Sequence, residues 1–135
     1  MIFLDSWIWL EFFQEDEKSA ETEKIIESVE DNSAIISATV LMEVRYQIQR
    51  KYGRRKADRL TSLIRSFDNL EIMPVTEEVA VYAADLRNKY YERQKNAISY
   101  ADSIHIAITE MTGCNKLYTG DPDFSDIEEV ETEII

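Results

Sequence analysis

The chain has 135 residues, of which 44% are hydrophobic and 10% aromatic, so it is long enough and apolar enough to fold as one domain with its own core. This composition excludes an intrinsically disordered chain, and no apolar run approaches the ~18 residues of a membrane span. The formal net charge of −12 argues against nucleic acid as a partner over most of the surface.

The charge is unevenly distributed along the chain. Residues 45–65 hold eight basic side chains and one acid, so this stretch carries +7 and the remainder carries −19. One face could therefore hold an anionic strand, although a basic run can also be only the solvated side of two helices. The basic residues are Arg45, Arg50, Lys51, Arg54, Arg55, Lys56, Arg59 and Arg65.

The cysteine content indicates the cellular compartment. The single Cys114 cannot form an internal disulfide, which fits a reducing cytoplasm. No basic-then-apolar leader precedes Asp5. We expect a cytoplasmic protein without a membrane anchor.

Hydrophobic periodicity predicts strands and helices that alternate along the chain. Gly53 interrupts one helical pattern, Pro74 closes a strand, and Thr76 can cap the helix that follows. In chain order we expect a strand at 2–4, a helix from about 7, a helix over 17–29, a strand at 34–38, a helix from about 39, a helix over 54–67, a strand at 70–73, a helix over 79–90, a helix over 99–113, a strand at 116–119 and a half-exposed edge strand over 130–134.

This alternation is typical of an α/β fold. We expect residues 1–135 to form a single domain with a central, mainly parallel sheet of four to five strands and helices on both faces. In such folds ligands bind beyond the carboxyl ends of the strands.

Four acids share that end of the predicted sheet. Asp5 follows the first strand, and Glu43 lies in the first turns of the helix after the second strand. Asp102 lies near the start of the buried helix that leads into the fourth strand, and Asp121 lies just past that strand. We expect the four carboxylates to converge.

Each acid also has a purely structural explanation. Asp5 could cap the helix that follows it, and Glu43 could be a favourable charge near a helix N-terminus. Asp102 could complete a capping box with Ser99, and Asp121 could be part of a turn. These readings leave the shared position of the four acids unexplained.

Converging carboxylates without basic partners repel one another, and a bound divalent cation removes the conflict. An all-oxygen ligand set favours Mg²⁺ or Mn²⁺ over zinc. Such an ion can activate water and stabilise charge on a phosphoryl group, so the acids favour phosphodiester hydrolysis.

The motifs resemble those of the PIN-domain ribonucleases, and the chain length is similar to that of the VapC-type toxins of prokaryotic toxin–antitoxin pairs. The resemblance rests on Asp5-Ser6 after the first strand, Glu43 in SATVLMEV, Asp102 in ADSIHIA, and TGDPDF at 119–124. It covers nearly the whole chain.

The resemblance implies a PIN-like α/β sandwich that cleaves single-stranded RNA, or a structured RNA loop, with Mg²⁺ or Mn²⁺. By position, Asp5, Glu43, Asp102 and Asp121 would be the catalytic, metal-binding acids, Asp123 an auxiliary acid, and Ser6 and Thr119 supporting hydroxyls. It also implies a homodimer and a small antitoxin protein as partner. Basic residues that could hold the RNA backbone are Arg45, Arg50, Lys51, Arg54 and Arg55.

His105 stands one turn after Asp102, a spacing that invites a metal-ligand role. A lone histidine on a buried helix is more often packed and hydrogen-bonded, and the family pattern tolerates histidine there without using it. We therefore do not count His105 among the ligands.

Three alternatives compete with a metal nuclease. A non-catalytic PIN-like module for RNA or protein would be marked by the loss of one metal acid, and all four are present. A receiver domain needs adjacent acids after the first strand and an acceptor after the third, which Ser6 and Met73-Pro74-Val75 do not supply. A haloacid-dehalogenase-like phosphatase needs an acid at position 7, which is Trp7.

Overall fold

The computed structural model describes all of residues 1–135 and contains one five-stranded sheet. Each strand falls within a segment that the sequence predicted as a strand, and every neighbouring pair is parallel. The strands are β1 (Ile2–Leu4), β2 (Ala34–Ser37), β3 (Leu70–Met73), β4 (Lys116–Thr119) and β5 (Thr132–Ile134). Their order in the sheet is β3-β2-β1-β4-β5, which confirms the α/β prediction.

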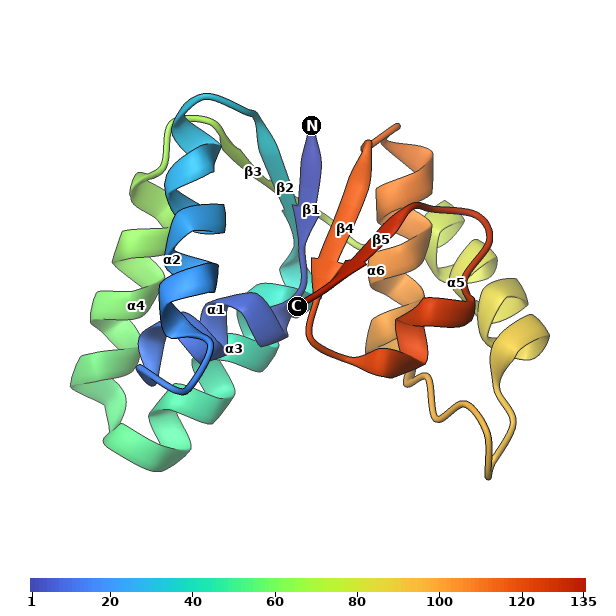
Figure 1. The fold of residues 1–135 in the computed structure, drawn as a ribbon, viewed down its shortest axis with the longest axis horizontal. Helices are drawn as coiled ribbons and strands as arrows, with labels where there is room; N and C mark the ends of the chain where they lie inside the picture. Colours follow the sequence, from blue (N-terminus) through green and yellow to red (C-terminus); the bar gives the residue numbers. More distant parts are fainter.

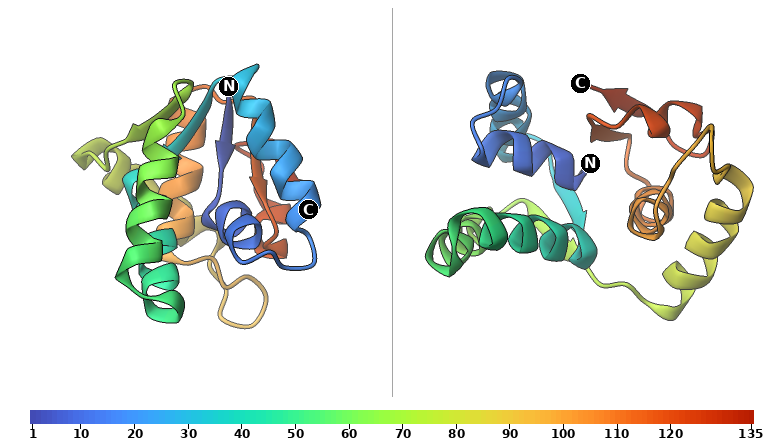
Figure 2. Two further views of the ribbon diagram at one scale, coloured as in Figure 1. Left: turned by 90° about the vertical axis from the view of Figure 1, so that its left-hand side faces the viewer. Right: turned by 90° about the horizontal axis from the view of Figure 1, so that it is seen from below.

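Helices cover both faces of the sheet. The helices are α1 (Ser6–Phe13), α2 (Ser19–Glu27), α3 (Ala38–Tyr52), α4 (Arg54–Ser66), α5 (Glu77–Tyr90) and α6 (Tyr100–Met111), with short 3₁₀ helices η1 (Ser28–Glu30) and η2 (Pro122–Asp126). In Figure 1, α1 to α4 lie to the left of the strands and α5 and α6 to the right, and the right-hand view of Figure 2 shows the same division from below.

The strand order fixes where the chain changes direction. From β1 the chain proceeds through β2 to β3 at one edge and then returns to β4 on the other side of β1. Right-handed crossovers therefore place the helices before and after this reversal on opposite faces. The carboxyl ends of β1 and β4 form the topological switch point, where α/β folds bind their ligands.

The core is a single cluster of 26 buried apolar residues. All four residues of β2 are buried, which is the pattern of a strand covered on both faces. Trp9 is completely buried and packs its indole edge to face against Phe67, with ring centroids 5.9 Å apart. Trp9 thus ties α1 to the end of α4.

Helix ends follow the local chemistry of the sequence. Ser37, Thr76 and Ser99 each accept a backbone N–H at the start of α3, α5 and α6. Gly53, with φ of +90°, separates α3 from α4 as the sequence predicted, because a residue with a side chain rarely adopts that angle. None of the helices combines the length and the apolar character that a membrane crossing requires.

Two predicted elements differ from the structure. The helix expected over 17–29 is divided into α2 and η1, and the strand expected over 130–134 is restricted to Thr132–Ile134. Val130 is buried ahead of β5, whereas Ile134 within it is 39% exposed. The alternation of apolar residues therefore begins at Val130, two residues before Thr132, where pairing with β4 starts.

Candidate metal centre

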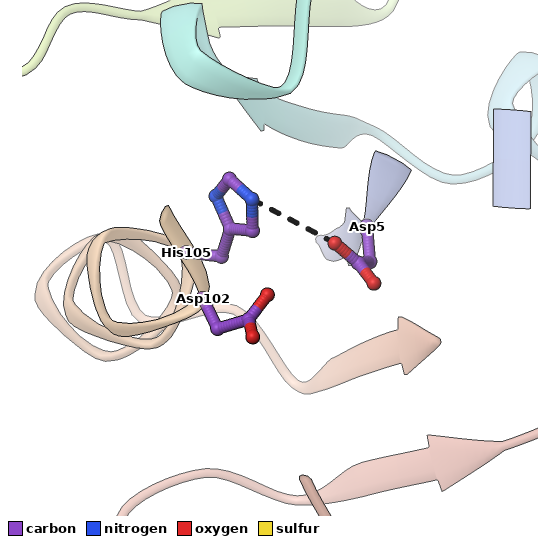
Figure 3. A group of neighbouring side chains, drawn as sticks. All are labelled: Asp5, Asp102 and His105. Atoms are coloured by element: carbon purple, nitrogen blue, oxygen red, sulfur yellow. Dashed lines mark ion pairs between the residues drawn. The ribbon is translucent and has the colours of Figure 1, made fainter. Parts of the chain in front are cut away.

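Two acids that are far apart in the sequence meet at the switch point. Asp5 lies at the carboxyl end of β1 and is the N-cap of α1, and Asp102 lies in the first turn of α6. Figure 3 shows Asp102 and His105 projecting from α6 toward Asp5. The ligand atoms of these three residues lie within 4.8 Å of one another.

Asp5 is buried and is held by two hydroxyl-bearing residues. Its Oδ1 accepts the Ser6 backbone N–H at 2.8 Å, and its Oδ2 accepts the Thr119 hydroxyl at 2.7 Å. The family resemblance implied supporting hydroxyls at Ser6 and Thr119; Thr119 contacts Asp5 through its hydroxyl, whereas Ser6 contacts it mainly through its backbone N–H, with its hydroxyl 3.4 Å from Asp5 Oδ1. Burial raises the pKa of Asp5, although His105 and the Thr119 hydroxyl oppose the shift.

Asp102 takes part in the capping box that the sequence offered as its structural explanation. Its Oδ2 accepts the Ser99 N–H at 3.0 Å, and its own N–H donates to the Ser99 hydroxyl at 3.0 Å. Oδ1 accepts no hydrogen bond, so one carboxylate serves the helix cap and the candidate site together. Burial raises the pKa of Asp102 to about 6, and the nearby Asp5 charge adds to the shift.

Glu43 does not lie at a helix N-terminus. It is the sixth residue of α3, beyond the first turn, so the explanation as a favourable charge for the helix dipole is wrong. Its Oε1 lies 2.8 Å from His105 Nε2, and Glu43 and Asp5 are close enough for their charges to interact. Glu43 therefore joins the site through His105 and is not in the closest group of ligand atoms.

His105 is completely buried and hydrogen-bonded at both ring nitrogens, as expected for a packed histidine. Its partners, however, place it at the centre of the acids, with Nε2 also 3.7 Å from Asp5 Oδ1. Burial alone would lower the pKa of His105, but Glu43, Asp5 and Asp102 together raise it. In the sequence, the spacing of one helical turn between Asp102 and His105 was the feature that indicated a role for His105 at the site.

Asp121 and Asp123 lie on the turn beyond β4, next to the closest group but outside it. The Asp121 N–H donates to the Thr119 hydroxyl at 3.1 Å, and that hydroxyl in turn donates to Asp5. Asp121 Oδ1 accepts the Asp123 N–H at 2.9 Å, which is the turn chemistry offered as its alternative explanation. The Asn96 side chain anchors the turn by donating to the Asp123 carbonyl at 3.0 Å.

Trp7 covers the same turn from the side of α1. A Cβ at Gly120 would lie 2.0 Å from Trp7 Cε2, so only glycine fits beneath the indole. Neither Trp7 nor Asn96 belongs to the site residues expected from the sequence, because both act by contact between distant segments.

The predicted basic residues lie along α3 and α4. Arg45 is occupied: its guanidinium donates to Thr61 Oγ1 and to Asp58 Oδ1, both at 2.8 Å. Arg50, Lys51, Arg54 and Arg55 are exposed at the far end of α3 and the start of α4. Arg50 is seven residues, or about 10 Å of helix, beyond Glu43. Arg50 and Lys51 thus lie beyond Glu43 on α3, and Arg54 and Arg55 follow at the start of α4.

The donor atoms fit a hard divalent cation. Asp5 is buried and Asp102 is half-buried, both carry raised pKa values, and neither has a lysine or arginine partner. Their carboxylate oxygens are the ligands that Mg²⁺ and Mn²⁺ prefer. A bound cation would relieve the repulsion that otherwise favours protonation.

Known proteins share this architecture. The family model described as PIN domain matches residues 2–130. No curated protein sequence matches the chain.

Among solved structures, the toxin VapC20 of Mycobacterium tuberculosis, described as cleaving the sarcin–ricin loop, is 22% identical with a TM-score of 0.79, covering 97% of this chain and 99% of that chain. VapBC2 of Rickettsia felis, bound to a promoter DNA fragment, is 20% identical with a TM-score of 0.77, covering 99% and 98%. A toxin–antitoxin complex of Klebsiella pneumoniae is 20% identical with a TM-score of 0.73, covering both chains in full. At these identities the likeness shows a shared fold.

Proposed function

Because the chain belongs to the PIN-domain family, we propose that it is a Mg²⁺- or Mn²⁺-dependent endoribonuclease that hydrolyses phosphodiester bonds of RNA. The observation that carries the proposal is the meeting of Asp5 and Asp102 at the switch point of the sheet, with Glu43 joined to them through His105. A structural role for each acid alone does not require them to meet.

In this proposal Asp5, Glu43, Asp102 and Asp121 hold the cation, with Asp123 as an auxiliary acid. When bound, the cation would supply an activated water and neutralise charge on the phosphate. Ser6 and Thr119 keep the Asp5 carboxylate in one orientation, and Ser99 does the same for Asp102. The protein's contribution is a set of acids whose geometry is established before the cation and the RNA arrive.

The substrate we propose is single-stranded RNA or an exposed loop of a structured RNA. VapC20, which shares the fold, is described as a toxin that cleaves the sarcin–ricin loop. Exposed cations at Arg50, Lys51, Arg54 and Arg55 could hold the backbone of a strand that extends from the acids along α3.

We also propose that the protein is the toxin of a toxin–antitoxin pair that acts in the cytoplasm as a homodimer. The support is the shared fold with VapBC2 of Rickettsia felis and with the toxin–antitoxin complex of Klebsiella pneumoniae. Sedimentation of the purified chain, alone and with the product of a neighbouring small gene, tests both the dimer and the partner.

The activity is tested with purified protein and a mixed pool of single-stranded RNAs in Mn²⁺, with EDTA as the metal-free control. The critical variant is Asp102→Asn, which keeps the size of the side chain and removes its charge. Asp126→Asn, at an exposed acid of η2, is the matched control. Sequencing of product ends identifies the cleaved bond and the preferred site together.

We expect wild type and Asp126→Asn to cut, and cleavage to disappear with EDTA and in Asp102→Asn. Equal cleavage by wild type and Asp102→Asn would contradict the site. An intact wild-type protein that binds RNA and not Mn²⁺, and that cuts no RNA, would instead support a non-catalytic binding module.

A further inference from the structure

His105 is hydrogen-bonded at both ring nitrogens, yet the proposed chemistry gives it no role. His105 Nδ1 lies 3.0 Å from Ser37 Oγ, and His105 Nε2 lies 2.8 Å from Glu43 Oε1. The ring is fully buried and packs against Phe3, with centroids 5.6 Å apart. Its contacts connect the end of β2, the second turn of α3 and the first turns of α6.

The direction of these hydrogen bonds follows from the partners of Ser37. The Val40 N–H donates to Ser37 Oγ at 3.0 Å, so the serine hydroxyl proton is free to donate to Nδ1 of a neutral ring. The ring proton then resides on Nε2 and is donated to Glu43. A protonated ring donates from Nε2 as well. In either state Nε2 carries a proton toward Glu43 and offers no lone pair to a metal.

We propose that Ser37 and His105 form a positioning relay that holds the Glu43 carboxylate toward Asp5 and Asp102. The proposal rests on the function proposed above, in which Glu43 is a metal ligand. His105 is thus a positioning residue, which acts on the cation through Glu43 and does not bind it. Glu43 Oε2 makes no hydrogen bond and remains available as the ligand atom.

Glu43 needs such a partner more than the aspartates do. Its side chain has three rotatable bonds, is 29% exposed and projects from the middle of a helix, where no backbone N–H is free to hold it. Asp5 and Asp102 are short, and each is held by a backbone N–H at a helix start. Partners that orient a metal ligand typically account for ~10–100-fold in metal affinity.

The test is the affinity for Mn²⁺, measured by titration calorimetry on the whole protein without RNA. The variants are His105→Leu, which removes the donor, His105→Gln, whose amide can donate from near the position of Nε2, Glu43→Gln, and the double variant Glu43→Gln/His105→Leu. We expect His105→Leu to weaken Mn²⁺ binding about 10–100-fold, His105→Gln to restore most of the loss, and the double variant to bind no more weakly than Glu43→Gln.

Wild-type affinity in His105→Leu, or additive losses in the double variant, would overturn the relay. Thr76→Ala is the control for stability, because it removes the helix cap of α5 without touching the acids and should leave Mn²⁺ affinity unchanged. Absence of Mn²⁺ binding by folded wild type would overturn both the relay and the nuclease. Binding that is lost in Asp102→Asn and retained in His105→Leu would overturn the relay alone.

A second measurement needs no substitution. His105 is the only histidine in the chain, so its two ring nitrogens can be observed directly by ¹⁵N NMR. With saturating Mg²⁺ we expect a protonated Nε2 and an unprotonated Nδ1. An unprotonated, metal-shifted Nε2 would make His105 a ligand and overturn the relay.

Discussion

Asp102 shows how one side chain can serve the fold and the site. One carboxylate oxygen completes the capping box of α6, the other accepts no hydrogen bond, and Figure 3 shows the side chain projecting toward Asp5. The sequence presented these two roles as alternatives. In the structure they coexist, because a carboxylate has two oxygens and a helix cap uses only one.

The pKa of Asp102 predicts how metal binding depends on pH. Because burial raises this pKa to about 6 and a cation binds the ionised carboxylate, a proton and the cation compete for the same group. We expect Mn²⁺ affinity to fall as the pH is lowered through about 6, by roughly tenfold per unit below it. Calorimetric titrations between pH 7.5 and pH 5 measure the effect; a constant affinity over that range would contradict it.

The same shift predicts that the metal-free protein becomes more stable when Asp102 is replaced. The folded-state pKa lies above the ordinary value of 3.8, so the folded state binds more protons between the two values and loses stability as the pH rises through them. Asp102→Asn removes this cost and keeps an oxygen for Ser99. In EDTA we expect the variant to be about 1–3 kcal/mol more stable at pH 7, with the difference vanishing near pH 4.

Thermal unfolding of both proteins at the two pH values measures this difference. Asp126→Asn, which changes an exposed acid, should match wild type throughout. A destabilised Asp102→Asn at pH 7 would mean that the carboxylate charge stabilises the metal-free fold.

At the scale of elements, α1 and the turn after β4 are fitted to one another. Trp7 is a partly buried residue of the first turn of α1, and its indole occupies the space where a side chain at position 120 would lie. The turn carries Asp121 and follows Thr119, which donates to Asp5. The aromatic side chain therefore influences the acids without contributing a polar atom.

Gly120→Ala tests this contact. The added methyl group would displace Trp7 or the turn, because it would lie about 2 Å from the indole, and overpacking of this kind typically costs ~1–3 kcal/mol. We expect lower stability, a changed tryptophan fluorescence and weaker Mn²⁺ binding. Substituting Trp7→Ala in the same chain should restore part of the stability. An unchanged Gly120→Ala would show that the turn can move freely.

At the scale of the whole molecule, the acids of the candidate site and the basic stretch lie on different parts of the fold. The switch point collects acids at the carboxyl ends of β1 and β4, while the basic stretch lies on α3, which Figure 1 shows leading away from the strand ends, and on α4, which runs back beside it. Within that stretch Arg45 connects α3 to α4 through Thr61 and Asp58, a structural use that the sequence did not indicate.

Four of the exposed cations in this stretch are expected to bind the RNA backbone. Replacing Arg50, Lys51, Arg54 and Arg55 with glutamine should weaken RNA binding and reduce the slope of log affinity against log salt by up to about 3, because each phosphate contact on a single strand contributes roughly 0.7. Fluorescence anisotropy in the Asp102→Asn background, which should not cut the RNA, measures the slope.

Calorimetry with Mn²⁺ in the otherwise wild-type chain is the control, because none of the four basic residues contacts the acids of the candidate metal centre. An unchanged salt slope would assign the basic stretch to the solvated side of two helices, the alternative that the sequence left open.

The sequence by itself determined the succession of elements and the end of the sheet at which the acids lie. Short apolar runs between amphipathic segments specify parallel strands, and Gly53, Thr76 and Ser99 mark helix ends through their own side chains or backbone angles. These are local effects, decided within a few residues by burial and hydrogen bonding.

Only the tertiary structure decided which side chains touch. Asp5 and Thr119 are 114 residues apart, and His105 and Glu43 are 62 apart. The sequence correctly predicted a packed His105 and had no means to indicate that its partner is Glu43. A hydrogen bond requires atoms to meet within about 3 Å, and that placement is fixed by helix packing and strand order over the whole chain, which local pattern does not encode.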